Sequence, residues 1–291
     1  MKITGHTKIC AVIGDPIEHS LSPVMHNAAL QHLGLDVIYV AFRVRGEALE
    51  DAVKGVRSLN IYGLNVTMPH KTAIIKYLDE VDPIAKDIES VNTVLNVNGK
   101  LIGFNTDGIG ALNALRYNHA DPKGRRVLIL GAGGAAKAIA YQIAASNAEK
   151  IVIINRTGEK AKELAKFLRK RFKVKIMGKQ LSTITLRKAL KETDILINAT
   201  SVGMRPYNDQ TLIDKQWLRR DMTVMDIVYD PVETKLLIDA KNIGAKVING
   251  IDMLLYQGAE SFKIWFRVDP PIDVMRKAII EELERRTGNA S

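Results

Sequence analysis

A glycine-rich segment near the middle of the chain has the spacing of a dinucleotide-binding turn. Gly131, Gly133 and Ala136 follow the apolar run 126–130 and precede an apolar pattern of helical period. In this setting Gly131 allows a tight turn, Gly133 lets the backbone approach a pyrophosphate, and the small Ala136 lets helix and strand pack closely. The helix N-terminus then faces the phosphates. The alternative is a tight strand-helix turn in a domain that binds no nucleotide.

The following strand indicates which dinucleotide is bound. The run 150–154 ends in Asn155-Arg156-Thr157, where an NAD-binding unit usually places an Asp or Glu roughly 20 residues after the glycines. A carboxylate there would hydrogen-bond a ribose 2'-hydroxyl and repel a 2'-phosphate, whereas the guanidinium of Arg156 can make a planar, charge-assisted contact with phosphate. We therefore expect NADP(H) rather than NAD(H).

A second set of polar side chains, in the first 110 residues, has the chemistry needed to hold a small hydroxylated acid and to move a proton. Asn65, Thr67 and Lys71 leave a predicted strand, and Pro69 fixes the exit of the chain. An ammonium beside a carboxylate can donate a proton to a developing alkoxide, and Lys71 with Asp107 is the pair suited to this. Further hydroxyls and amides for an anion and a polyol come from Ser20, Ser22 and Asn92.

Each of these residues also has a purely structural interpretation. Ser22 precedes Pro23, which is typical of an N-cap followed by the first residue of a helix. Asn65 and Asn92 would satisfy turn backbone, and Lys71 would be a surface lysine. The functional interpretation therefore depends on the combination. The six histidines have no metal-ligand spacing, so we expect no metal.

Composition sets the general class. The 291 residues fit about two domains of ~100 to 200 residues. No run approaches the ~20 apolar residues of a membrane span, and residues 1–6 lack the features of a signal peptide, so we expect a cytoplasmic protein without a membrane partner. Cys10 lies in an apolar run and is the single cysteine, which indicates a buried core residue rather than a catalytic thiol.

The chain is basic, with 42 Lys and Arg against 32 Asp and Glu. A charge of +10 raises the question of nucleic acid binding. Many of the cations, as in 159–171, lie at the spacing of a solvated helix face. Aromatic residues make up 5% of the chain, too few for base-stacking platforms. We expect no nucleic acid partner, and a positive field that gathers an anionic cofactor and substrate.

Strand and helix patterns alternate along the chain, which predicts an α/β fold with mainly parallel sheets. The first part has predicted strands 9–13, 37–42, 63–66, 93–97 and 101–104, with a hairpin turn at Asn98-Gly99, helices 22–34 and 47–59, and short helices after Pro69 and Pro83. The second part has predicted strands 126–130, 150–154, 174–177, 195–198, 223–226 and 246–248. Two final helices, 253–266 and 271–285, are expected to pack back across both parts.

A series of short motifs runs in order along nearly the whole chain. They are Ser20-Leu21-Ser22-Pro23, Asn65-Val66-Thr67-Met68-Pro69-His70-Lys71, Val91-Asn92-Thr93, Asn105-Thr106-Asp107-Gly108, the glycine loop, Asn155-Arg156-Thr157, Asn198-Ala199-Thr200-Ser201-Val202-Gly203-Met204, Tyr229-Asp230-Pro231 and Gln257-Gly258-Ala259. In content and order they resemble the shikimate/quinate dehydrogenase family. His70 stands where that family often has a different residue.

The resemblance implies three regions: a substrate-binding catalytic domain over 1–112, an NADP-binding Rossmann domain over 113–250, and C-terminal helices over 251–291 that return to the substrate domain. It also assigns the substrate contacts. The substrate carboxylate would be bound by Ser20, Ser22 and Tyr229. The ring hydroxyls would be held by Asn65, Thr67, Asn92, Asp107 and Gln257, with Lys71 as the acid/base.

The same resemblance assigns the cofactor contacts. The pyrophosphate would lie on Gly131, Ala132, Gly133, Gly134 and Ala135. The adenosine ribose with its 2'-phosphate would contact Asn155, Arg156, Thr157 and Lys160. The nicotinamide side would be lined by Thr200, Ser201 and Met204, with backbone contacts from Ile227 and Gly250.

The reaction implied is the reversible, NADPH-dependent reduction of 3-dehydroshikimate to shikimate by a monomer or homodimer. Two alternatives stay open. One is a quinate/shikimate dehydrogenase that uses NAD, against which the missing acid at 155–157 argues. The other is a non-catalytic, NADP-sensing regulator with a degenerate site, against which the presence of Lys71 and Asp107 argues.

Overall fold

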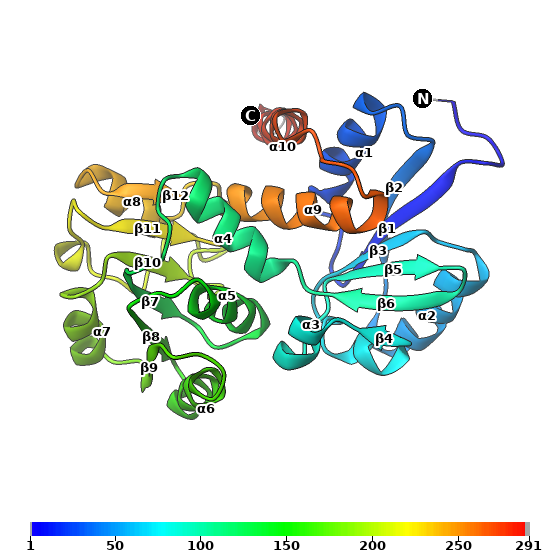
Figure 1. Ribbon diagram of the computed structural model, residues 1–291. Helices are drawn as coiled ribbons and strands as arrows, with labels where there is room; N and C mark the ends of the chain where they lie inside the picture. The colour runs from blue at the N-terminus through cyan, green and yellow to red at the C-terminus, as the bar shows by residue number, and fades with distance from the viewer. Residues whose placement is uncertain (1, 289–291) are drawn as a thin grey trace. The chain divides into compact units, whose positions relative to one another are not determined.

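Two separate sheets organise the chain in the computed structural model, which describes residues 2–288. Unit 1 is formed by the chain up to Thr106 together with the chain from Gln257 onward, and unit 2 is Asp107–Tyr256 (Figure 1). Residues 289–291 of the predicted C-terminal segment lie outside the described part. Among the described residues, no helix combines the length and apolarity needed to cross a membrane.

The sheet of unit 1 has the order β2-β1-β3-β5-β6-β4. Its strands are β1 (Lys8–Gly14), β2 (Val37–Arg43), β3 (Gly63–Val66), β4 (Glu80–Val81), β5 (Thr93–Val97) and β6 (Lys100–Phe104). β1 runs parallel to β2 and β3, whereas β5 runs antiparallel to β3 and β6. The predicted hairpin is confirmed, and both of its turn residues, Asn98 and Gly99, have positive φ. The sheet is therefore mixed, and its short edge strand β4 was not predicted.

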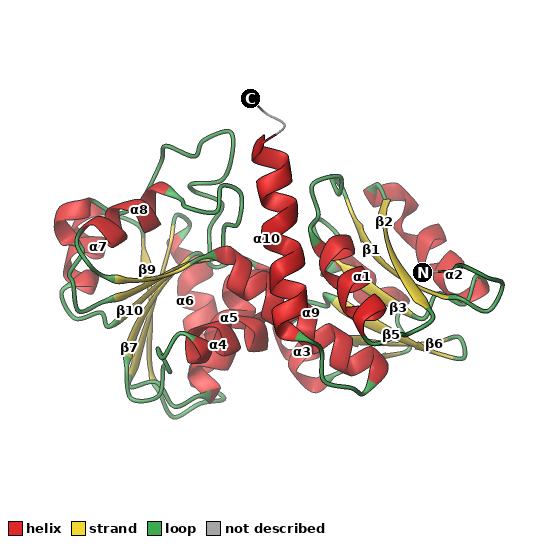
Figure 2. Ribbon diagram, turned by 90° about the horizontal axis from the view of Figure 1, so that it is seen from above, coloured by secondary structure: helices red, strands yellow, loops and turns green. Residues whose placement is uncertain are grey.

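The helices of unit 1 cover both faces of this sheet (Figure 2). They are α1 (Ser22–His32), α2 (Leu49–Ser58), α3 (Pro83–Ile88), the part of α9 (Gly250–Phe266) from Gln257, and α10 (Ile272–Gly288), with 3-10 turns at Gly46–Ala48 and Ala73–Tyr77. Leu49, Val53 and Val56 of α2 pack on one face. On the other, Tyr39 of β2 stacks with His26 of α1. The short helix predicted after Pro69 is the 3-10 helix Ala73–Tyr77.

The prediction that Ser22 is a helix N-cap is wrong. The N-cap position is Leu21, without a side-chain capping bond, and Ser22 is already helical. The first hydrogen bond of α1 is accepted by the Leu21 carbonyl, one residue before Ser22, because the Met25 N–H donates to it at 3.2 Å. Pro23 is tolerated at the second helical position because its missing N–H would have no intrahelical partner there.

The sheet of unit 2 has six parallel strands in the order β12-β11-β10-β7-β8-β9. They are β7 (Arg126–Leu130), β8 (Lys150–Asn155), β9 (Lys175–Gln180), β10 (Ile195–Asn198), β11 (Thr223–Asp226) and β12 (Lys246–Ile248). All six predicted strands are confirmed, and β9 extends three residues further than predicted. The order reverses between β7 and β10, and ligands of such sheets bind outside the carboxyl ends of the strands at this reversal.

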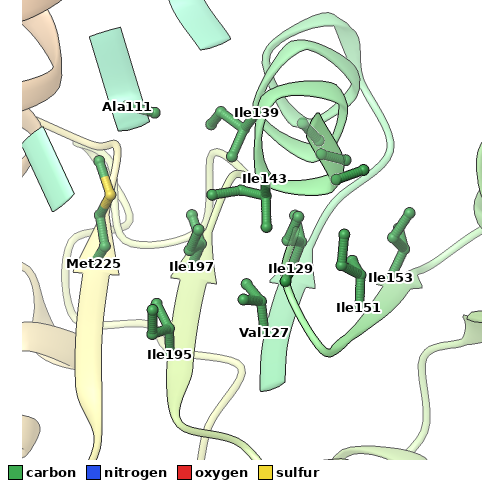
Figure 3. Packing of buried hydrophobic residues seen from close by; sticks show 14 of the residues in the cluster. Ala111, Val127, Ile129, Ile139, Ile143, Ile151, Ile153, Ile195, Ile197 and Met225 are labelled. Carbon is green, nitrogen blue, oxygen red and sulfur yellow. The ribbon is translucent and has the colours of Figure 1, made fainter. Parts of the chain in front are cut away.

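Helices also cover both faces of this second sheet (Figure 2). α4 (Asp107–Tyr117), α5 (Gly134–Ala145) and α6 (Gly158–Arg169) lie on one face, and α7 (Thr183–Leu190) and α8 (Lys235–Asn242) on the other, with a 3-10 turn at Lys215–Trp217. Figure 3 shows Ile129 of β7 and Ile197 of β10 beneath Ile139 and Ile143 of α5. Burial on both faces explains why these strands are continuous apolar runs rather than alternating patterns.

Candidate active site

The turn after β7 requires glycine at its first position. Gly131 has φ of +110°, in the left-handed region that favours glycine, and an added Cβ would lie 2.7 Å from the carbonyl oxygen of Ala199. The Gly131 N–H donates to the Ile154 carbonyl at 2.8 Å. The turn is therefore fixed between the carboxyl ends of β8 and β10.

The start of α5 is open to an anion. Gly133 is the N-cap residue and supplies no side-chain capping bond. Gly133 and Gly134 are exposed, and an added Cβ on Gly133 would meet nothing within 4 Å. The amides of the first helical turn have no intrahelical acceptor, so they are available to a pyrophosphate. Ala136 is fully buried, as the predicted close packing of helix and strand requires.

The end of β8 fits a 2'-phosphate. The Asn155 side chain donates to the Thr157 carbonyl at 3.0 Å and so closes the turn into α6. Arg156, Thr157 and Lys160 are exposed around it. The nearest acid along the chain, Glu159, is exposed and pairs with Lys162 at 3.1 Å. The turn thus offers cations and a hydroxyl, which suits a phosphate better than a ribose hydroxyl.

Two buried polar residues, which the sequence analysis did not select as site residues, shape the loops beyond β10 and β11. The Asn198 amide donates to Asp226 Oδ1 at 3.0 Å and to the Val202 carbonyl at 3.1 Å, and Asn198 Oδ1 accepts from Thr200 Oγ1 at 2.7 Å. Asp226 also accepts from the Val228 N–H at 3.0 Å and from Thr234 Oγ1 at 2.7 Å. Burial raises the pKa of Asp226 above the ordinary value of an aspartate, and the hydrogen bonds from these donors offset part of the rise.

These contacts fix the loops that carry the predicted nicotinamide contacts. The backbone N–H and the hydroxyl of Thr200 both donate hydrogen bonds to Asn198 Oδ1. Ser201 and Met204, which follow in the same loop, are exposed. A Cβ on Gly250 would come within 2.4 Å of the Val228 carbonyl oxygen and 2.6 Å of that of Ile227. Gly250 is therefore required for close packing against 227–228. The signal for this pair of loops was a polar residue at the end of each of two apolar strands.

A buried polar network in unit 1 brings three predicted substrate residues together. Asn65 is on β3, Asn92 lies just before β5, and Gln257 is on α9. The Asn65 side chain donates to the Asn92 carbonyl at 3.1 Å, and the Asn92 side chain donates to Gln257 Oε1 at 3.2 Å. Asn65 and Asn92 are 6% and 2% exposed. The Asn65 amide is therefore held by the Asn92 backbone, and the side-chain amides of Asn92 and Gln257 bond directly to each other.

Ser261, a residue that the sequence analysis missed, connects this network to α9. Its hydroxyl oxygen lies 2.7 Å from Thr93 Oγ1 and accepts from Asn65 Nδ2 at 3.0 Å. It also lies 3.3 Å from Thr106 Oγ1. The available signal was a serine four residues after Gln257, on the same helix face.

Lys71 is held beside the network by its backbone. Its carbonyl accepts from the Val91 N–H at 2.8 Å, and the Thr67 N–H donates to the Ile13 carbonyl at 2.9 Å. The Lys71 side chain is half-buried. The neighbouring His70 is buried with Nε2 2.6 Å from the Val44 carbonyl oxygen, which gives it a structural role.

Ser20 and Ser22 lie together at the start of α1, where the Ser22 N–H donates to Ser20 Oγ at 3.3 Å. Ser22 is 7% exposed. Ser20 also borders a hollow of about 660 Å³ whose other lining belongs to α1 and α10. The hollow is therefore lined by two helices and not by the amide network.

The remaining predicted residues lie in unit 2. Asp107 is buried as the first residue of α4, and Tyr229 is half-buried after β11. Lys71 and Asp107 thus belong to different units, and their pairing stays a prediction. Cys10 is fully buried, as predicted, and burial raises its pKa to about 12. Within residues 2–288, no group of three or more His, Cys, Asp or Glu could hold a metal ion.

Together the fold and these residues define a two-unit α/β protein with a dinucleotide-binding sheet and a separate polar network. Three family models match in succession: the shikimate dehydrogenase substrate binding domain over 12–94, shikimate / quinate 5-dehydrogenase over 114–233, and the shikimate 5'-dehydrogenase C-terminal domain over 250–280. The chain belongs to the shikimate dehydrogenase family.

Known proteins match over nearly the full chain. The shikimate dehydrogenase (NADP+) of Methanocaldococcus jannaschii is 48% identical over 284 residues, which cover 97% of this chain and 100% of that protein. A crystal structure of a shikimate dehydrogenase in complex with NADP+ superposes with a TM-score of 0.90 at 47% identity and covers 97% of each chain. The structure of shikimate 5-dehydrogenase from Listeria monocytogenes, in complex with shikimate and NAD, superposes with a TM-score of 0.89 at 41% identity. It covers 95% of this chain and 98% of that one.

Proposed function

We propose that this chain catalyses the reversible, NADPH-dependent reduction of 3-dehydroshikimate to shikimate, a step towards aromatic amino acids. The observation that carries this proposal is the amide network of Asn65, Asn92 and Gln257, which suits a ring with several hydroxyls. The near full-length likeness to NADP+-dependent shikimate dehydrogenases supports it.

Unit 2 would hold the cofactor. The turn and helix start at Gly131–Ala135 fit the pyrophosphate. The positive φ at position 131 requires glycine, and Gly133 makes no side-chain capping bond, so the first helix amides can donate to the pyrophosphate. Arg156, Thr157 and Lys160, with Asn155, would hold the 2'-phosphate. Thr200, Ser201 and Met204 would line the nicotinamide side, with backbone contacts from Ile227 and Gly250. When bound, NADPH supplies the hydride that is transferred to C3.

Ser20 and Ser22 would donate hydrogen bonds to the substrate carboxylate, helped by Tyr229. Hydroxyl donors suit this task because a carboxylate only accepts hydrogen bonds. The ring hydroxyls would be held by Asn65, Thr67, Asn92, Asp107 and Gln257. The side-chain oxygens of these residues can each accept a hydrogen from a ring hydroxyl.

Lys71 would move the proton. Its ammonium has three donors and can give one proton to the C3 oxygen as negative charge develops there during reduction. In the oxidation of shikimate the neutral amine would take the proton from the C3 hydroxyl. Asp107 would accept a hydrogen bond from a ring hydroxyl and orient the Lys71 ammonium by its charge.

The assay follows reduced-nicotinamide absorbance with shikimate or quinate, each in the presence of NADP+ or NAD+. We expect the highest kcat/KM with shikimate and NADP+. A higher value with quinate and NAD+ would identify the alternative dehydrogenase. Tight NADP+ binding without turnover of either acid would identify a regulator instead of an enzyme.

A further inference from the structure

A hollow of about 250 Å³ lies in unit 2 at the amino ends of its parallel strands. It is lined by residues at the starts of β10, β11 and β12, by Arg125 just before β7, and by the chain that follows α4. The predicted cofactor turn follows the carboxyl end of β7, at the opposite edge of this sheet. β10 and β11 are each four residues long, so roughly 10 Å of strand separates the two edges. The hollow is therefore distinct from the predicted dinucleotide site.

Three cationic side chains line this hollow: Arg125, Arg220 and Lys246. The Arg220 side chain lies on the turn before β12, since a Cβ added to Gly244 would be 3.5 Å from Arg220 Cγ and Nε. The Lys246 ammonium donates to the Asn118 carbonyl at 2.9 Å, where the C-terminus of α4 attracts positive charge. Arg125 and Arg220 are exposed, and neither forms an ion pair with any residue that the structure describes. Both guanidinium groups can therefore bind a ligand.

The carboxylates in the lining, Asp194 and Asp221, are paired with arginines that lie outside it. Asp194 accepts from Arg126 Nη2 at 2.6 Å and from Arg126 Nε at 3.1 Å, and these bonds hold the pKa of Asp194 below its ordinary value. Asp221 pairs with Arg219 at 3.1 Å. The acids are thus compensated by other cations, and the hollow keeps an excess of positive charge. Like charges that converge on one hollow repel one another, and a bound anion would remove this repulsion.

We propose that the hollow between Arg125, Arg220 and Lys246 is a binding site for a small anion that carries a phosphate group. A guanidinium matches two phosphate oxygens with its planar N–H groups, and an ammonium adds a compact charge. A phosphate group carries a charge of about −1.5 to −2 at pH 7, so it matches several cations better than a single carboxylate does.

The size of the hollow limits the ligand further. Its volume of about 250 Å³ is below the ~300 to 1,000 Å³ of sites for drug-sized ligands. It therefore suits inorganic phosphate or a small phosphate monoester, and it is too small for a dinucleotide. The site is additional to the cofactor and substrate sites and does not depend on the reaction proposed for them.

Isothermal titration calorimetry of the full chain, saturated with NADP+, tests the site. Inorganic phosphate and glycerol 3-phosphate are titrated separately, and NADP+ keeps both out of the dinucleotide site. We expect one phosphate group to bind per chain, and the tighter of the two compounds distinguishes free phosphate from a monoester. Potassium chloride at the same ionic strength should give no saturable binding. The site is contradicted if neither compound binds saturably, or if NADP+ displaces both.

Two variants locate the bound phosphate. Arg220→Ala and Arg125→Ala should each weaken its binding by about 10- to 100-fold, the effect of losing one charged hydrogen bond. Both side chains are exposed, so the urea midpoint of each variant should stay near that of the wild type. Wild-type affinity in both variants would place the phosphate elsewhere and overturn the proposal.

The matched control is Arg187→Ala, which removes the same charge from an exposed position of α7 outside the hollow. Its affinity for phosphate should stay within about twofold of the wild-type value. Equal losses in Arg187→Ala and Arg220→Ala would show a general attraction of phosphate to a basic protein, and would also overturn the site.

Discussion

Asn198 and Asp226 form a buried pair at the carboxyl ends of the neighbouring strands β10 and β11, with the Asn198 amide 3.0 Å from Asp226 Oδ1. Asp226 is fully buried and receives two more hydrogen bonds, from the Val228 N–H and the Thr234 hydroxyl. One carboxylate therefore satisfies three donors where both loops leave the sheet. This relationship connects the stability of unit 2 with the shape of its predicted nicotinamide loops.

Asp226→Ala should cost about 2 to 5 kcal/mol in the free energy of unfolding, because three donors lose their acceptor in a buried site. Urea denaturation measures the loss. The control is Asp221→Ala, which removes an exposed carboxylate paired with Arg219 at 3.1 Å and should cost less than about 1 kcal/mol. Equal costs in the two variants would show that the buried network contributes no more than a surface ion pair.

Arg156→Ala should weaken NADP+ binding by about 1.5 to 3 kcal/mol, the range for one charged hydrogen-bonded contact, with little change in the use of NAD+. The KM of each cofactor at saturating shikimate gives the result. Arg187→Ala, which removes an exposed arginine of α7, controls for the change in net charge and should leave the KM for NADP+ and the KM for NAD+ unchanged. Parallel losses with NADP+ and NAD+ would exclude a specific contact with the 2'-phosphate.

Lys71→Ala should fold and bind shikimate and NADP+ nearly normally, and should lose about 100- to 10,000-fold in kcat, the range for a general acid/base. Steady-state turnover and ligand titration measure the two effects separately. Lys76→Ala removes an exposed lysine from the following 3-10 turn and should keep wild-type turnover. If Lys71→Ala retains a third or more of the wild-type rate, proton transfer runs through another group.

His26 makes unit 1 sensitive to acid. Its ring is 1% exposed, and neither ring nitrogen has a hydrogen-bond partner in the described part of the chain. Burial lowers the pKa of His26 from 6.5 to about 3. Between these two values the unfolded chain binds a proton that the folded protein does not. Stability is therefore full above pH 6.5 and declines as the pH falls towards 3.

The measurement is the free energy of unfolding of the wild type and of His26→Phe at pH 7 and pH 5. The wild type should lose about 2 kcal/mol more than the variant over this interval, at ~1.4 kcal/mol per pH unit below 6.5. His32→Gln, which changes an exposed histidine of the same helix, should keep the wild-type dependence on pH. Identical losses in wild type and His26→Phe would contradict the burial of a neutral His26.

Much of unit 2 could be predicted from the sequence because its signals act over a few residues. Gly131 is required by a local backbone conformation, and the apolar runs of β7 and β8 show burial on both faces. In unit 1, the hairpin at Asn98-Gly99 could likewise be predicted, because these two residue types favour the positive φ that its turn requires. The order of the motifs along the chain was enough to indicate the family.

Tertiary structure alone decided which polar atoms meet. Asn65 bonds to Tyr39 at a separation of 26 residues and to Ser261 at 196, and no periodicity or spacing encodes such partners. The pairing of the short edge strand β4 with β6 also depended on neighbours in space. The physical reason is that a propensity or a turn belongs to a short segment, whereas a hydrogen bond between distant segments exists only after packing has set their register.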